Sequence, residues 1–182
     1  GQLGDFKDSI LVNVEIPTAH KMIWDDFRVV ENWTLKGSSG FNPTLSVPED
    51  ASAPVNMLFN YKSARSPYVQ FAREAPIYSR PDTIRIPMHT DAIFSKIYAT
   101  VRANNAIQGI NITIEPNQVG DVTLDIPVEE CFGTDVAIYP LHFELVKMFL
   151  NTSTEVGERY VALPGIQLLY GDADETDVDN VL

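Results

Sequence analysis

The amino-acid sequence predicts an all-β fold, a two-sheet antiparallel β-sandwich with little or no helix. Between Asp82 and Tyr170, apolar and polar residues alternate in one short segment after another, and turn residues separate the segments. Because successive side chains of a strand point to opposite faces, this alternation indicates half-buried antiparallel strands. The chain has 182 residues, of which 45% are hydrophobic, so it can bury one substantial core. We therefore expect a single sandwich domain.

The expected order of elements begins with a polar lead-in and a strand in residues 1–21. Residues 10–16 alternate like a strand that a proline ends, and another strand begins near Met22. The sandwich domain is expected over residues 22–171. Residues 172–182 are rich in Asp and Glu, and we expect them to form an acidic C-terminal tail.

The first half of the domain is expected to contain one long connection. Residues 35–54 are rich in Gly, Ser, Pro and acidic residues and hold few apolar ones, which indicates a surface connection. Strands are expected at 55–61 and 68–71. Pro76, Pro81 and Pro87 then limit strand length. Pro87 indicates an edge strand or a bulge, because proline has no N–H for the ladder.

Four later segments carry their branched apolar residues mainly on one face. In the first of them, Ile84, Ile86 and Met88 share one face and Arg85 points the other way. The other three segments alternate in the same way, so each of the four is predicted to be a half-buried strand. The four segments are 83–88, 97–102, 110–114 and 122–126.

The last part of the domain contains one ambiguous segment. The apolar residues of 141–150 fit both the helix and the strand template, and we interpret the segment as a strand with a bulge near Glu144. The final pair of strands is expected at 160–163 and 166–170. Pro164-Gly165 should form the bend between them.

Charge and composition argue against several classes of partner. The formal net charge is -12 and the pI is near 4.5, whereas nucleic acids and anionic membranes call for basic surfaces. No apolar run reaches the roughly 20 residues of a membrane span, so no membrane insertion is expected. Cys131 is the only cysteine, which excludes an intrachain disulfide, and we expect it to be buried as an ordinary apolar residue.

No catalytic motif is visible, so we expect a noncatalytic protein with no catalytic residues. The three histidines lie far apart, no H-E-x-x-H helix or Gly-x-Ser-x-Gly turn is present, and no metal ligands follow a known spacing. Asp25-Asp26 and Glu129-Glu130 are adjacent pairs, which on a strand point to opposite faces and cannot form the facing carboxylates of glycoside hydrolysis. An enzyme would need two carboxylates, or a His-acid pair, brought together by folding.

Several short motifs, taken in order, resemble a known family. They are 24–27 (Trp-Asp-Asp-Phe) leading to Trp33, 80–86 (Arg-Pro-Asp-Thr-Ile-Arg-Ile), 139–141 (Tyr-Pro-Leu) and 161–166 (Val-Ala-Leu-Pro-Gly-Ile). Together they resemble a galactose-binding-like jelly roll. Residues 64–69 (Ala-Arg-Ser-Pro-Tyr-Val) and the last motif resemble, more narrowly, the accessory jelly roll found beside phosphodiester glycosidase domains in secreted bacterial proteins. The resemblance covers residues 22–171.

The resemblance implies a noncatalytic, carbohydrate-binding-like accessory domain of a secreted, periplasmic or cell-surface protein. Its partners would be a glycan and an adjacent glycosidase domain. The alternative is a structural or protein-interaction sandwich that packs on a catalytic neighbour and binds no sugar. Similar jelly rolls often hold a structural calcium between a carboxylate near the first strand and one in the last strand. Asp26 could supply one ligand, but Leu168-Leu169-Tyr170 occupies the other place, so no cofactor is predicted.

A sugar site needs an exposed aromatic side chain beside planar or forked hydrogen-bonding groups. Tyr98 and Arg102 share the outward face of one predicted strand, and Arg65 and Tyr68 flank a tight Ser-Pro step in a loop. These four are the candidate carbohydrate-binding residues. The simpler interpretation of Tyr98 is an ordinary surface residue of a strand, because tyrosine favours strands. No row of exposed aromatic residues can be recognised, and Trp33 and Phe27 are expected in the core.

Overall fold

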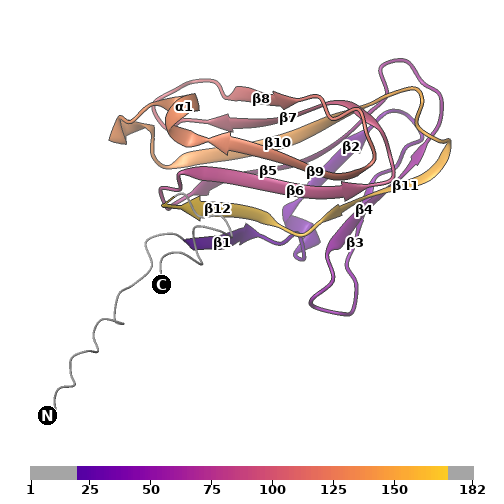
Figure 1. The fold of residues 1–182 in the computed structure, drawn as a ribbon, viewed down its shortest axis with the longest axis horizontal. Coiled ribbons are helices and arrows are strands. Elements are labelled where there is room, and N and C mark those ends of the chain that lie inside the picture. Colours follow the sequence, from indigo (N-terminus) through magenta and orange to yellow (C-terminus); the bar gives the residue numbers. More distant parts are fainter. Residues whose placement is uncertain (1–19, 172–182) are drawn as a thin grey trace, which may run out of the picture.

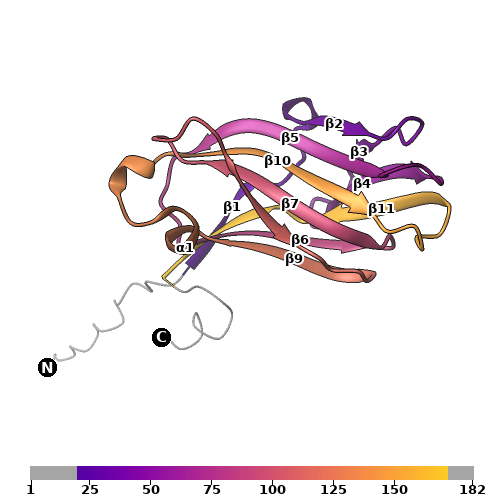
Figure 2. The ribbon, with the colours of Figure 1, turned by 90° about the horizontal axis from the view of Figure 1, so that it is seen from above.

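The computed structural model describes residues 20–171, which form two stacked antiparallel sheets (Figures 1 and 2). The predicted strand at 10–16 and the acidic tail at 172–182 lie outside the described residues. The strands are β1 (His20–Asp25), β2 (Thr34–Gly37), β3 (Thr44–Ser46), β4 (Val55–Tyr61), β5 (Tyr68–Ile77), β6 (Thr83–Thr90), β7 (Phe94–Arg102), β8 (Ile110–Ile114), β9 (Gly120–Pro127), β10 (Leu141–Leu150), β11 (Gly157–Leu163) and β12 (Ile166–Tyr170). The helical elements are α1 (Val128–Phe132) and the 3-10 turns η2 (Val30–Asn32) and η3 (Val136–Ile138). The predicted all-β sandwich is confirmed.

The two sheets differ in size and in how their strands meet. The five-stranded sheet has the order β2-β5-β10-β7-β8. In the seven-stranded sheet, β6 lies between β9 on one edge and β12 and β11 on the other, with β12 opposite 83–85 and β11 opposite 89–90. β1 pairs with β12, while β4 pairs with β11 and carries β3 at its outer edge. β11 and β12 therefore follow one another across the middle of this sheet.

The core lies between the sheets and is built by the predicted alternation. Ile84, Ile86 and Met88 of β6 are buried, and β9 and residues 97–102 of β7 bury every second residue in the same way. Six phenylalanines are fully buried: Phe27, Phe41, Phe59, Phe71, Phe94 and Phe143. Trp33 is 6% exposed and packs against Phe27 with ring centroids 4.6 Å apart, so both belong to the core as predicted. Burial of large apolar side chains is the main driving force for this fold.

Two irregular features of the C-terminal half are confirmed. β10 is a strand, and its registers with β5 and with β7 both shift between Phe143 and Leu145, which is a bulge at Glu144. β11 and β12 are separated by Pro164-Gly165. Gly165 has φ 144°, and a Cβ there would lie 3.2 Å from the Asp25 carbonyl oxygen, so both the backbone conformation and the close approach favour glycine.

Three expectations about strands are wrong, and in each case the reason lies in how the strands pair. Residues 35–54 are not only a connection, because the short strands β2 and β3 pair with the outer edges of β5 and β4. Pro76 does not end β5, since it lies beyond the part of that strand that β2 covers. Pro87 lies in an interior strand without a bulge, and it is tolerated because the registers of β12 and β11 leave residues 86–88 without a partner on that edge.

Glu129 and Glu130 lie on α1 and not on a strand. Helix α1 is five residues long and directly follows the edge strand β9. Cys131, on the same helix, is half-buried against the core, and burial raises the pKa of its thiol above the ordinary value, with a further rise from the Glu130 carboxylate. This thiol therefore stays protonated at neutral pH and is a poor nucleophile.

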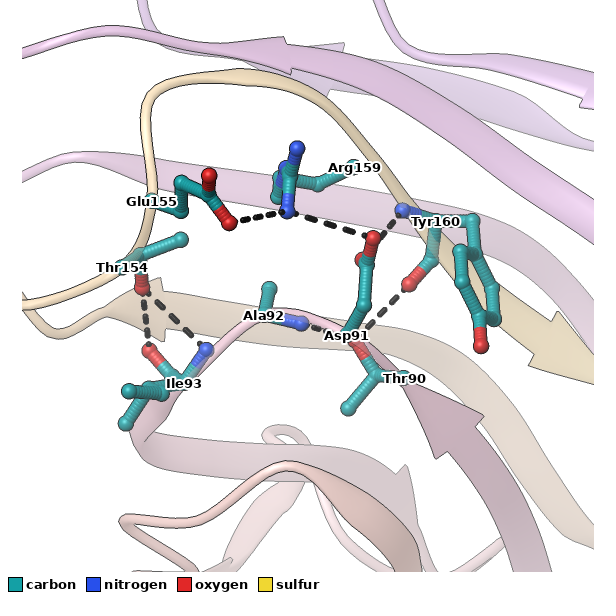
Figure 3. Close-up of polar contacts among 8 residues, drawn as sticks. All are labelled: Thr90, Asp91, Ala92, Ile93, Thr154, Glu155, Arg159 and Tyr160. Carbon is teal, nitrogen blue, oxygen red and sulfur yellow. Dashed lines mark hydrogen bonds and ion pairs between the residues drawn. The ribbon is translucent and has the colours of Figure 1, made fainter.

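Buried hydrogen bonds join the β6–β7 turn to the β10–β11 connection (Figure 3). Thr154 Oγ1 accepts from Ile93 N at 3.2 Å and donates to Ile93 O at 3.0 Å. Thr90 Oγ1 donates to Tyr160 O at 2.7 Å, and Asp91 accepts from Tyr160 N at 2.9 Å. Thr90 and Thr154 are 1% and 4% exposed. These bonds fix the start of β7 beside the end of β10, at one end of the five-stranded sheet.

Replacing Thr154 with valine is expected to lower the free energy of unfolding by about 1 to 3 kcal/mol, because the isosteric side chain leaves the Ile93 N–H buried without an acceptor. Chemical denaturation of the two proteins measures the difference. Thr152→Val is the matched control, since Thr152 is exposed in the same connection. Equal stability of the two variants would contradict this role for Thr154.

Candidate functional site

Three aromatic side chains lie side by side on the outer face of the five-stranded sheet. They are Tyr68 of β5, Phe149 of β10 and Tyr98 of β7, which we call the aromatic row. The ring centroids of Tyr68 and Phe149 are 6.4 Å apart, and those of Phe149 and Tyr98 are 6.2 Å apart. Successive rings are tilted by 45° and 39°, and each side chain is half-buried. The row thus offers continuous apolar surface across three adjacent strands.

Strand register brings the three rings together. Tyr68 is directly opposite Phe149, whereas Tyr98 is opposite Lys147, two residues before Phe149 on β10. Direct and diagonal neighbours of this kind bring large side chains into contact on one face of a sheet. The flanking residues Val69, Met148 and Ala99 are fully buried on the inner face. The rings therefore lie on the outward phase of their strands.

Ammonium groups lie over the aromatic row. The Lys147 Nζ is 4.5 Å from the ring centroid of Tyr68 and 5.2 Å from that of Phe149. The Lys96 Nζ is 5.1 Å from the centroid of Phe149. Both are at cation–π distance, and they place hydrogen-bond donors directly beside apolar ring surface.

The side-chain amides of Gln70 and Asn111 lie next to the aromatic row. Gln70 of β5 is half-buried between Lys36 of β2 and Lys147 of β10 in the strand register. On the far side of Tyr98, Thr100 donates to the Asn111 side chain at 2.7 Å, which leaves the amide nitrogen of Asn111 free to donate elsewhere. The row is thus bordered on two sides by groups that can hydrogen-bond to hydroxyls.

The structure places Arg102 on the same face as Tyr98 but does not bring the two together. They are four positions apart on β7, which is about 13 Å along a strand. The Arg102 Nη1 donates to the carbonyl of Ala106 at 3.1 Å, and its Nε is 3.6 Å from the Glu144 carboxylate. The guanidinium therefore already holds the turn after β7 and the bulge of β10.

Arg65 and Tyr68 are separated by the turn that leads into β5. Arg65 is exposed, Ser66 has φ 48°, and Pro67 is buried. Tyr68 belongs to the aromatic row, while Arg65 lies in the adjoining loop, where it makes no hydrogen bond or ion pair within residues 20–171. Of the four predicted residues, the two tyrosines are thus brought together and the two arginines are not.

The residue that sequence reasoning missed is Phe149, which joins the two tyrosines into a row. The bulge at Glu144 shifts the phase of β10, so that Leu145, Lys147 and Phe149 face outward after it. Alternation counted from the start of the strand therefore assigns Phe149 to the wrong face. The row could therefore not be recognised in the sequence, although the structure contains it.

A buried polar cluster lies at the end of β1, on the other sheet. The Asp25 side chain, 7% exposed, accepts from Phe27 N at 2.7 Å and from Trp33 Nε1 at 3.2 Å, and it forms an ion pair with Arg73. Phe27 has φ 67°, and the bond from its N–H to Asp25 holds this unusual turn. The Arg73 guanidinium also lies 5.4 Å from the Trp24 ring centroid. All ligating oxygens of Asp25 are thus used by the fold.

The residues after β1 are held by contacts within the chain. The Asp26 carboxylate accepts from Arg28 N at 3.1 Å. The Arg28 guanidinium donates to the carbonyls of Asp50 at 3.3 Å and Ala51 at 3.0 Å, and to those of Pro48 and Ala53. A positive charge from the chain itself therefore occupies this carbonyl-rich loop. Within residues 20–171 no group of three His, Cys, Asp or Glu side chains is close enough to hold a metal ion.

Comparisons with known proteins identify similar folds but no family. No protein-family model matches the chain, and no curated protein matches it. A family 11 carbohydrate-binding module from a cellulosomal cellulase of Clostridium thermocellum is similar in structure, with a TM-score of 0.50 and 15% identity over 86% of this chain and 97% of that chain. A structure of carbohydrate-binding modules of the β-sandwich superfamily, described as promiscuous in specificity, has a TM-score of 0.50 and 9% identity over 79% of this chain and 60% of that chain.

At these identities the comparisons establish the fold, a β-sandwich of the type found in carbohydrate-binding modules. The two antiparallel sheets of residues 20–171 agree with the predicted two-sheet β-sandwich. No helix in the described part of the chain has the length and apolar character needed to cross a membrane.

Proposed function

We propose that this domain is a noncatalytic module that binds a carbohydrate chain along the outer face of the five-stranded sheet. The observation that carries the proposal is the aromatic row of Tyr68, Phe149 and Tyr98, which is bordered by the amide of Gln70 and the ammonium of Lys147. Sugar rings present apolar C–H faces surrounded by hydroxyls, so they need apolar ring surface beside hydrogen-bonding groups.

An open face suits an extended ligand and a binding function. The aromatic row crosses three adjacent strands, spaced about 4.8 Å apart, so a chain of several sugar units can lie across it. The acidic residues on the strands of this sheet are Glu74 and Glu144, and Glu144 is paired with Arg102 at the bulge. Hydrolysis of a glycosidic bond needs two facing carboxylates, so the arrangement favours binding over catalysis.

The comparisons support this proposal by analogy of fold. Both similar structures are described as carbohydrate-binding modules, and one of them belongs to a cellulase. Fold alone is a weak basis for function, so the proposal rests on the face itself. The resemblance of 64–69 and 161–166 adds that the domain acts beside a phosphodiester glycosidase domain, in a secreted or cell-surface protein. The full-length reading frame tests that context.

The second candidate function is docking onto a neighbouring domain. Next to β1, Ile23 is 48% exposed and Val29 is 54% exposed, and both line a shallow hollow with Trp24 and Asn32. Exposed apolar side chains that gather in one place are typical of protein interfaces. This surface lies away from the aromatic row, so docking here leaves the sugar-binding face open.

A glycan array tests the proposed function directly. We expect at least one carbohydrate to be bound, with binding abolished by the same sugar in free form. Tyr78, which is 85% exposed beyond the end of β5, provides a matched control: Tyr78→Ala should retain every signal. An array without any signal that free sugar competes away would favour the docking function instead.

A further inference from the structure

The end of the outer face that carries the aromatic row also carries three lysines, Lys36 of β2, Lys147 of β10 and Lys96 of β7, which we call the lysine cluster. Lys36, Gln70 and Lys147 follow one another in a single cross-strand row, and Lys96 is directly opposite Phe149. Lys36 and Lys96 are exposed, and Lys147 is half-buried over the rings. The aromatic row is therefore bordered by positive charge on several strands.

Within residues 20–171 these ammonium groups have no carboxylate partners. The ion pairs of residues 20–171 join Asp or Glu to Arg73, Arg85, His89, Arg102 and Arg159, and none involves a residue of the lysine cluster. The outer face of the other sheet differs, because Arg85 and His89 each face an aspartate of β9 there. The lysine cluster is thus available for an anionic ligand.

The strands of the five-stranded sheet hold few acidic residues, and Glu115, which directly follows β8 next to Lys96, forms no ion pair within residues 20–171. Among these strands the only acidic residues are Glu74 and Glu144. Glu144 lies five residues before Phe149 and Glu74 six residues after Tyr68, which corresponds to about 16 Å or more along a strand. Glu144 is also paired with Arg102. No carboxylate on these strands is therefore placed to neutralise the lysine cluster.

This local charge is opposite to that of the whole chain. The chain has 25 acidic residues and 13 lysines and arginines, so its net charge of -12 repels anions at long range. A patch of unpaired cations on such a chain favours anions at that patch alone. The cations also lie over the ring faces, where a neutral sugar must displace them but an anionic sugar can pair with them.

We infer that the ligand of this face is an anionic polysaccharide, whose sugar rings pack on the aromatic row while its carboxylate or sulfate groups pair with Lys36, Lys96 and Lys147. The inference rests on the proposed function and adds the chemical class of the ligand. Carboxylates and sulfates share the charge that the lysine cluster recognises, so the experiment separates them.

The test uses isothermal titration with matched pairs of polymers. Polygalacturonate is compared with its carboxyl-reduced form, and a sulfated galactan with its desulfated form. We expect at least one acidic polymer to be bound about tenfold more tightly than its neutral counterpart, as three partly exposed ion pairs allow. This preference should weaken between about 0.05 M and about 0.5 M salt because the charges are screened. The pair of polymers that shows this preference tells whether the lysine cluster recognises carboxylates or sulfates.

Three variants identify the cations responsible. Changing all three lysines to glutamine should reduce binding of the acidic polymer to the level of its neutral form, whereas changing them to arginine should retain it, because arginine keeps the charge. Lys21→Gln on β1, at the other sheet, is the control and should have no effect. Thermal unfolding verifies that each variant is folded. If the triple glutamine variant is unstable, the single variant Lys36→Gln replaces it, because Lys36 lies over no aromatic ring of residues 20–171.

Two results would overturn the inference while leaving the proposed function intact. One is equal binding of acidic and neutral polymers that still depends on the aromatic row. The other is full binding by the glutamine variant. Equally tight binding of poly-L-glutamate, which has charge but no sugar, would show unselective attraction of polyanions and would also overturn it. Failure to bind any polysaccharide, acidic or neutral, would contradict the proposed function as well.

Discussion

Replacing Asp25 with alanine is expected to lower the free energy of unfolding by about 3 kcal/mol, the largest stability effect that we expect for a single polar side chain here. Asp25 accepts hydrogen bonds from Phe27 N and Trp33 Nε1, and it neutralises Arg73. Its loss leaves the N–H of a left-handed turn and an indole N–H without an acceptor, and it leaves a half-buried guanidinium unpaired. Chemical denaturation with fluorescence detection measures the change, and Trp33 itself provides the signal.

The neighbouring residue supplies the control for this prediction. Asp26 is exposed and accepts one hydrogen bond, from Arg28 N, so Asp26→Ala should cost less than about 1 kcal/mol. Asp25→Asn should fall between the two variants, because the amide oxygen can still accept from Phe27 N and Trp33 Nε1 but does not neutralise Arg73. Similar losses for Asp25→Ala and Asp26→Ala would show that the buried cluster is not what holds this turn.

Removing the aromatic row is expected to have the largest effect on sugar binding. Tyr98→Ala and Phe149→Ala should each weaken binding by about 1 kcal/mol, which is about fivefold, because each removes one ring from the apolar surface. The double variant should lose roughly the sum or more, since the two rings contact each other. Titration with a carbohydrate that the array identifies measures the loss.

The folded state of these variants must be established in parallel. Tyr98 is half-buried on the outer face, so Tyr98→Ala should keep the fold and most of its stability, as for a surface change. Tyr78→Ala removes a tyrosine elsewhere on the surface and should keep full affinity. Unfolding of Tyr98→Ala would place this ring in the core, and unchanged affinity in the double variant would exclude the row as the binding surface.

The fold could be predicted from the sequence wherever local alternation decides it. β6, β9 and residues 97–102 of β7 alternate without interruption, and their buried phases are as predicted. β2 and β3 could not be predicted, because strands of four and three residues are too short to show an alternation of apolar and polar residues. They form strands because they pair with the outer edges of β5 and β4. Pro87 illustrates the same limit, because the gap between β11 and β12 that tolerates it is a property of the assembled sheet.

The candidate site could be predicted only in part. The outward phase of Tyr98 follows from alternation in β7, and Tyr68 begins a strand that the sequence indicates. The row itself depends on β10 lying between β5 and β7, a pairing of residues about 80 positions apart in the sequence that no local pattern reveals. The lysine cluster was missed for the same reason, since its members come from three strands.

The measurement that tests the central claim most directly is a titration of the isotopically labelled domain with a bound carbohydrate, followed by amide chemical shifts. The claim is that the outer face of the five-stranded sheet, around Tyr68, Phe149 and Tyr98, is the binding surface. We expect the largest shifts in β5, β10 and β7 near these residues, with little change in β1 and β12. Shifts confined to the loop held by Arg28 or to the surface around Ile23, with none in the aromatic row, would contradict it.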